Sequence, residues 1–186
     1  MKLNLRHLII LGTIAATASL LCPKTPAQEN ETSNSVLVSM SGAHSHVEQA
    51  KYLRITSAKD FQSIYMQHLG KKPEEFDAYY NPHGVPTIDF QRCIVIAVFG
   101  GKGWNSAGID VKSVIDGSEL IVRFDDRSYQ TAGPNGGGDQ VCPYGFFVLP
   151  RSEKAVVLEE DVQQYIGGEP QWKERARFAR IEPSGE

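Results

Sequence analysis

Among residues that could do chemistry, a glycine-rich segment is the first candidate for a ligand site. Gly100-Gly101-Lys102-Gly103 resembles a phosphate-binding loop in composition. A true phosphate loop has the spacing G-x-x-x-x-G-K-[ST] and leads directly into a helix, whereas the segment that follows here alternates like a strand. The glycines therefore predict a flexible connection between two strands and no phosphate site.

The histidines and acids do not have the spacing of a catalytic or metal site. His44 and His46 would share one face of a strand, with His68 and His83 as further ligands, but no cysteine or carboxylate stands at a ligand spacing beside them. Covalent catalysis requires a nucleophile, a base and an orienting group, and the chain has neither a Gly-x-Ser-x-Gly elbow nor a Ser-x-x-Lys pair leading into a helix. The pair Asp125-Asp126 is typical of solvated charges at a strand end. We therefore expect no enzyme activity, no metal and no cofactor.

Trp104 points to a different kind of chemistry, because it is a large aromatic residue within the glycine-rich segment 100–106. Such a residue either folds back into the domain as an anchor or stands exposed as a contact for a partner. The sequence leaves both alternatives open, and the same argument applies to Tyr129 in the second glycine-rich segment, 125–139. The candidate partner-binding residues are Trp104, Asn105, Ser106, Arg127 and Tyr129.

Cys93 and Cys142 form an even pair in the part of the chain that would remain after export. In an oxidising compartment such a pair favours a disulfide, and closing a loop of this length would stabilise the fold by roughly 4 kcal/mol. The alternative is two small buried side chains, because a free cysteine packs as a hydrophobic residue.

The first half of the chain predicts two strands and a helix. Residues 35–40 and 50–55 are candidate strands, and an apolar stripe predicts a helix over 58–69. Ser57 is a favourable N-cap, and Gly70 stands where a helix C-terminal glycine is expected. A second, shorter helix is expected to begin at Pro73, with Phe76, Tyr79 and Tyr80 on its apolar side.

From residue 90 onward the pattern is that of β-structure. The apolar run 93–99 predicts a strand buried on both faces, and Asp116-Gly117 predicts a hairpin turn between two alternating segments. Two more strands are expected at 141–149 and 155–158. If the strands run up and down in an antiparallel sheet, segments 100–106 and 125–139 share one edge of the domain.

The N-terminus has the features of a secretion signal. Lys2 and Arg6 precede an apolar run of 14 residues, which is too short to span a bilayer, and small residues precede a cleavage point after Ala27. Lipidation at Cys22 is the alternative, but bulky Leu21 does not fit lipoprotein processing. The mature chain would carry 16 basic and 22 acidic residues, a net charge of −6, which gives it no electrostatic attraction to nucleic acid.

The sequence thus divides into four parts. We expect a signal peptide over 1–27, a flexible leader over 28–34, a single domain over 35–165 and a charged C-terminal tail over 166–186 that forms a short helix or stays loose. The protein is expected to be exported to the periplasm or the extracellular space, without a membrane span in its mature form.

Pro86-Thr87-Ile88-Asp89-Phe90 resembles the P-x-[VI]-D-F entry of the PrcB-like C-terminal domain, which occurs in secreted accessory subunits of bacterial protease complexes. The strand 93–99 with its terminal glycines and Cys142-Pro143-Tyr144 fit the same pattern, and the resemblance covers about residues 56–160. One departure is that Ser106-Ala107-Gly108-Ile109 stands where the family shows Thr-Gly-Gly-Tyr. The resemblance implies a non-enzymatic module that associates with a secreted protease.

Together these observations predict an α+β domain with one main helix packed on an antiparallel sheet or small β-sandwich. The expected function is that of a non-catalytic exported protein-interaction module, which serves as an accessory or stabilising subunit of a secreted protease or binds another envelope protein. The alternative is a small-molecule or metal-binding envelope protein. An apolar pocket beneath the two glycine-rich segments would favour that alternative, and a flat or convex edge would favour protein contact.

Overall fold

The fold was analysed in a computed structural model of the chain, which describes residues 36–131, 137–163 and 168–182. The predicted signal peptide over 1–27 and the leader over 28–34 lie outside the described residues. None of the described helices is long and apolar enough to cross a membrane.

Two four-stranded sheets form a small α+β sandwich, as the sequence predicts. The first sheet has the order β1-β8-β3-β2 and is antiparallel throughout; its strands are β1 (Val38–Gly42), β2 (Lys51–Ile55), β3 (Cys93–Phe99) and β8 (Tyr144–Pro150). The second has the order β10-β9-β6-β5; its strands are β5 (Ser106–Asp116), β6 (Leu120–Ser128), β9 (Val156–Asp161) and β10 (Trp172–Phe178). A short ladder joins β4 (Gly103–Trp104) to β7 (Gln140–Val141).

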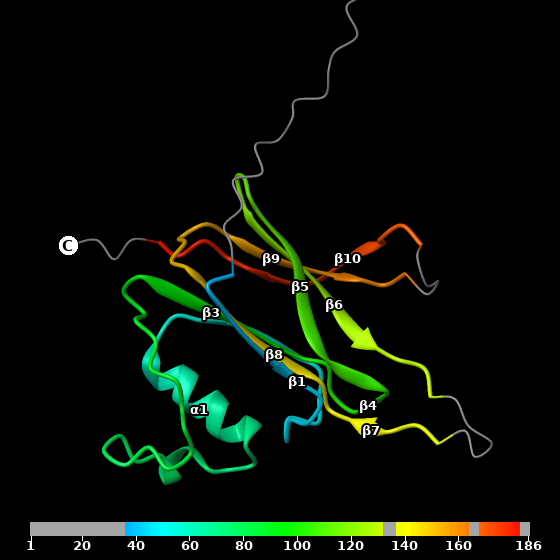
Figure 1. Cartoon of the computed structure of the whole chain (residues 1–186). Helices are drawn as coiled ribbons and strands as arrows, with labels where there is room; N and C mark the ends of the chain where they lie inside the picture. Colours follow the sequence, from blue (N-terminus) through cyan, green and yellow to red (C-terminus); the bar gives the residue numbers. More distant parts are fainter. Residues whose placement is uncertain (1–35, 132–136, 164–167, 183–186) are drawn as a thin grey trace, which may run out of the picture.

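The first sheet lies in the middle of the molecule, between the second sheet and helix α1 (Ala58–His68) (Figure 1). Side chains such as Ile96 and Phe147 fill the space between the sheets, and Val95 and Phe146 on the opposite face pack against Phe61 of α1. Strands β3 and β8 therefore contribute to both cores. This confirms the prediction that 93–99 is buried on both faces and explains why its sequence is apolar without alternation.

Helix α1 begins and ends where the sequence predicts. The Ser57 hydroxyl accepts the Asp60 backbone N–H at 3.1 Å, which is the hydrogen bond expected of an N-cap. Gly70 follows the C-cap residue Leu69 with φ of +70°, a left-handed conformation that glycine adopts without steric cost.

The prediction of a second helix with Phe76, Tyr79 and Tyr80 on its apolar side is wrong. Only a single 3₁₀ turn forms, η1 (Pro73–Glu75). The Asp77 carboxylate accepts the backbone N–H groups of Tyr79 and Tyr80 at 2.8 and 3.2 Å, so a local turn replaces the helical hydrogen bonds. Phe76 packs against the core beneath α1, while both tyrosines are exposed.

The C-terminal segment is neither a helix nor loose where the structure describes it, because β10 pairs antiparallel with β9. Ala176 and Phe178 alternate with exposed Arg177 and pack against the core between the sheets, as a strand pattern requires. A register shift between Glu174 and Ala176 precedes them, and Trp172 at the start of the strand lies against the Arg123 guanidinium instead. Arg177 forms ion pairs with Glu119 and with Glu174. The order of strands also differs from an up-and-down sheet, since β9 runs parallel to β6.

Cys93 and Cys142 are free and lie at opposite ends of the β3–β8 ladder. Cys93 is opposite Pro150 at one end, and Phe99 is opposite Tyr144, two residues after Cys142, at the other. At about 3.3 Å per residue, six residues of strand separate the cysteines by roughly 20 Å. A disulfide requires Cα atoms within about 7 Å, so the prediction of an intrachain bridge is wrong.

Candidate partner-binding surface

The β4–β7 ladder joins the two glycine-rich segments at one end of the sandwich (Figure 1). Gly103 is opposite Val141, and Trp104 is opposite Gln140. The structure therefore pairs residues that are 36 and 38 positions apart in the sequence. The second glycine-rich segment is shorter than expected, because β6 continues to Ser128.

Asn105 holds this end of the molecule together. Its backbone N–H donates to the Asp139 carbonyl at 2.9 Å, its side-chain oxygen accepts the Asp139 N–H at 2.8 Å, and its carbonyl accepts the Tyr129 N–H at 2.8 Å. Its φ of +56° lies in the left-handed region, where asparagine is one of the few non-glycine residues that occur. Strained backbone of this kind is concentrated at functional sites.

Trp104, next to Asn105, is exposed. Of the two alternatives that the sequence leaves open, Trp104 is therefore an exposed residue and not an anchor folded back into the domain. Its relative exposure is 63%, and Tyr129 is exposed by 40%. The Tyr129 hydroxyl donates to the Asp139 carboxylate at 3.0 Å, and this hydrogen bond raises the pKa of the phenol. We call Trp104, Asn105, Tyr129 and Asp139 the Trp104 surface.

Gly138 explains how the indole can lie close to the second segment. A Cβ at this position would come within 3.1 Å of the Trp104 ring and 3.0 Å of the Asn105 side-chain oxygen. A larger residue would therefore push the ring or the asparagine aside. Gly138 and Asp139 were not among the predicted site residues, although an acid at the end of a glycine run, just before strand β7, was a signal in the sequence.

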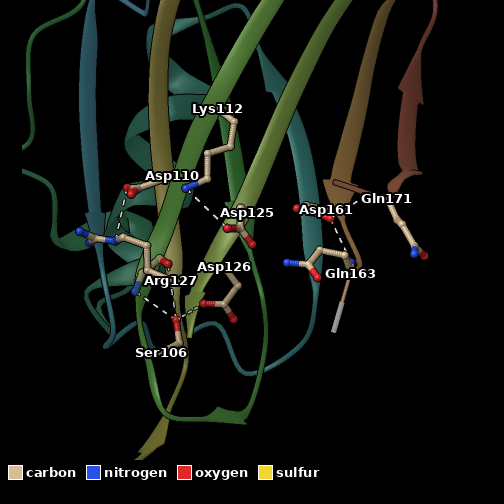
Figure 2. A network of polar contacts seen from close by, with 10 residues as sticks. Ser106, Asp110, Lys112, Asp125, Asp126, Arg127, Asp161, Gln163 and Gln171 are labelled. Carbon is tan, nitrogen blue, oxygen red and sulfur yellow. Dashed lines mark hydrogen bonds and ion pairs between the residues drawn. The ribbon is translucent and has the colours of Figure 1, made fainter. Parts of the chain in front are cut away.

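Ser106 is only 1% exposed and so cannot contact a partner. Its hydroxyl accepts the Gly108 N–H at 3.1 Å and donates to the carboxylate of Asp126 on the neighbouring strand β6, two residues before Ser128, which is opposite Ser106 (Figure 2). Burial raises the pKa of Asp126, and the Ser106 hydrogen bond offsets part of this shift. Ser106 is therefore a structural residue beneath the surface and not part of the contact.

Arg127 lies outside this buried pair. Its guanidinium donates to the Ala107 carbonyl at 2.8 Å and forms an ion pair with Asp110 at 3.4 Å (Figure 2). Because both groups are partly exposed, the ion pair orients the side chain more than it stabilises the fold. Arg127 stays accessible at the edge of the Trp104 surface.

Figure 2 also shows a group of hydrogen bonds between the end of β9 and the residue before β10. The Asp161 carboxylate accepts the backbone N–H groups of Gln163 at 3.0 Å and Gln171 at 2.8 Å. These bonds bring together the two ends of the connection, so that Trp172 can begin β10. The sequence pattern did not indicate this role for Asp161.

His46 and His68 are neighbours, but the histidines of the described residues do not gather around a common metal site. His44 lies next to Cys142 in an isolated bridge, and the ring of His46 lies against Gly70. His68 is 5% exposed among aromatic rings, and burial lowers its pKa to about 4. Within residues 36–131, 137–163 and 168–182, no three His, Cys, Asp or Glu side chains are grouped so that they could hold a metal ion.

Two hollows lie apart from the residues of the Trp104 surface. A groove of about 790 Å³ lies between residues 46–51 and the C-terminal end of α1, and a cavity of about 180 Å³ lies beneath the segment 76–90. Neither is lined by Trp104 or Tyr129. Comparison with known proteins adds no identity, because no family model, no curated protein and no solved structure matches this chain.

Proposed function

We propose that this protein is a non-catalytic, exported protein-interaction module, and that the Trp104 surface is its contact with the partner. The observation that carries the proposal is that Trp104 is exposed in the short β4–β7 ladder. The residue after it in the chain, Asn105, is fixed by three hydrogen bonds. Tryptophan and tyrosine are the residues most enriched at energetic hot spots of protein interfaces. A contact residue on a rigid frame also loses little conformational entropy when it binds.

The proposed partner is a secreted protease or another envelope protein. This part of the proposal rests on the resemblance of Pro86–Phe90 and of strand 93–99 to the PrcB-like domain, and on the N-terminal features of a secretion signal. The departure at Ser106–Ile109 falls on residues that support the Trp104 surface from within. Ser106 hydrogen-bonds Asp126 there, and Gly108 keeps a positive φ of +122°.

The experiment places a photo-crosslinking residue, p-benzoylphenylalanine, at position 104 in the exported protein. Tyr79 is the matched control, because it is an exposed aromatic side chain on the segment after η1, away from the β4–β7 ladder. We expect one specific adduct, identified by mass spectrometry as a protease or another envelope protein, from position 104 and not from position 79. The same adduct from both positions, or none from position 104, would contradict the proposal.

A binding measurement with the purified partner then tests the energetic role of the indole. Trp104→Ala is expected to weaken binding by about 2 kcal/mol, roughly 30-fold, which is the scale of an interface hot spot. The control variant is Tyr80→Ala, which removes another exposed aromatic side chain and should leave the affinity unchanged. Equal affinities for wild type and Trp104→Ala would show that the partner binds elsewhere.

A further inference from the structure

A polar groove opens beside the Trp104 surface. Its walls are residues 46–51, which connect β1 to β2, and Gln67, Gly70 and Lys71 near the C-terminal end of α1. With a volume of about 790 Å³, the groove has the size of a ligand site, and it is large enough for a few residues of extended polypeptide. We refer to it as the basic groove.

The basic groove and the Trp104 surface are joined by the segment that leads into β4. The Lys102 backbone N–H donates to the Glu48 carbonyl at 3.0 Å. Gly101, with φ of +78°, packs so closely on this wall that a Cβ would lie 2.7 Å from the Ala50 nitrogen. Trp104 follows only two residues after Lys102, so one bound chain can contact both places.

Lysines outnumber acids around the groove, in contrast to the net charge of −3 of the whole chain. The single acid in its lining, Glu48, forms an ion pair with Lys102 at 2.7 Å. Lys51 and Lys71 also line the groove, and neither forms an ion pair within the described part of the chain. Glu75, which does not line the groove, also lies close to Lys71, and its carboxylate accepts the Lys72 backbone N–H at 2.9 Å.

The walls of the groove are held in place before any ligand binds. The His46 backbone N–H donates to the His68 carbonyl at 3.0 Å, which fastens the β1–β2 connection to the last turn of α1. The His46 ring covers Gly70, where a Cβ would lie 2.7 Å from the ring carbons. The groove is therefore a preorganised polar surface, which lowers the entropic cost of binding.

We propose that the basic groove binds an extended acidic segment of the same partner protein that contacts Trp104. This inference rests on the proposed function and adds the chemistry of the bound segment. Lys51 and Lys71 attract and hold its carboxylates, while the Trp104 surface supplies the aromatic anchor. Charge complementarity of this kind mainly raises the association rate and the selectivity, and it weakens as salt screens the charges.

The test uses the full mature protein and a synthetic octaglutamate peptide, with octaglutamine as the neutral control probe. Binding is followed by backbone amide NMR shifts, which report where the peptide lies. We expect octaglutamate to shift the amide signals of residues 46–51 and 67–71, and octaglutamine to leave them unchanged. Charge reversal at both lysines, Lys51→Glu with Lys71→Glu, is expected to weaken octaglutamate binding about tenfold.

The matched control is Lys59→Glu with Lys173→Glu, which makes the same charge change at two exposed lysines outside the groove. We expect its affinity to stay within about twofold of the wild type. An equal loss of affinity in both double variants, or shifts located elsewhere, would overturn the proposal, because the attraction would then be a general charge effect. Binding of vesicles that contain anionic phospholipid, without groove shifts from octaglutamate, would instead assign the lysines to a membrane surface.

Failure of this inference can be told apart from failure of the proposed function. If Trp104→Ala weakens binding of the identified partner and the groove variant does not, the Trp104 surface stands and the basic groove is overturned. If octaglutamate maps to the groove but position 104 crosslinks to no partner, the proposed function fails and an acidic-peptide site remains.

Discussion

The sharpest test of the structure is the effect of acid on His68. This histidine lies at the end of α1, with the centre of its ring 4.0 Å from that of Tyr144 and 5.5 Å from that of Phe146. Its Nδ1 is buried and has no hydrogen-bond partner among the residues that the structure describes. Burial, with a smaller contribution from nearby His46, lowers its pKa from 6.5 to about 4.

The magnitude and sign follow from proton linkage. In the unfolded chain His68 gains a proton near pH 6.5, whereas in the folded protein it does so only near pH 4. Between these values the unfolded state binds more protons, so the free energy of unfolding falls as the pH falls. The full difference of about 2.5 pKa units corresponds to about 3 kcal/mol, and about 2 kcal/mol of this is already lost at pH 5.

The assay is urea unfolding of wild type and His68→Phe at pH 7.5 and pH 5. Phenylalanine keeps an aromatic ring in the cage and removes both the titrating group and the unpaired nitrogen. We expect the wild type to lose about 2 kcal/mol more than the variant between the two pH values. Other titrating groups are present in both proteins and cancel in this comparison.

Two results would refute this reasoning. One is an equal loss of stability in wild type and variant, and the other is a His68 imidazole that titrates near pH 6.5 when followed by NMR in the native protein. If His68→Phe does not fold, the native-state titration alone decides the question.

Three further predictions concern the support of the Trp104 surface and the cysteines. Gly108→Ala is expected to lower the free energy of unfolding by about 2 kcal/mol or more, as measured by urea unfolding. The reason is that Gly108 has a φ of +122° and that a Cβ there would lie 2.7 Å from the Gly42 nitrogen. Gly117→Ala, in the open hairpin turn, is the control, and equal effects of the two substitutions would refute the steric argument. Asp126→Asn is expected to stabilise the protein at neutral pH, because burial raises the pKa of Asp126 and so disfavours its charged form. The gain should decline as the pH falls below this raised pKa and vanish below the ordinary aspartate pKa of 3.8. A variant that is less stable at pH 7 than at pH 3, relative to wild type, would contradict this sign. Thiol labelling of the denatured mature protein should find both Cys93 and Cys142 free, and an intact mass lower by two hydrogens would contradict their separation along the β3–β8 ladder.

Short-range features of the fold could be predicted from the sequence because they depend on neighbouring residues. Ser57 caps α1 with its own hydroxyl, and Gly70 ends the helix because it adopts a positive φ. The turn at Asp116-Gly117 joins β5 to β6 directly. In each case the decisive interaction lies within a few residues of the chain.

The same reasoning failed where a local alternative competed with the helix pattern. Aromatic residues after Pro73 have a helical spacing, but the Asp77 carboxylate takes the backbone N–H groups of Tyr79 and Tyr80. Aspartate favours turns for this reason, and the signal was present in the sequence. Strand β10 was missed because its charged residues find partners, such as Glu119, that are distant in the chain.

By itself, the sequence determined the composition of the candidate site: one aromatic residue in each of two glycine-rich segments, Trp104 and Tyr129, without the motif of a catalytic or metal centre. Only the tertiary structure decided which of those residues can be touched. Trp104, in the β4–β7 ladder, is exposed, while Ser106, which hydrogen-bonds to Asp126 on the neighbouring strand, is buried. The strand register likewise separates Cys93 from Cys142. Exposure and distance depend on which strands pair and in what register, and those contacts join residues far apart in the chain, where local patterns carry no information.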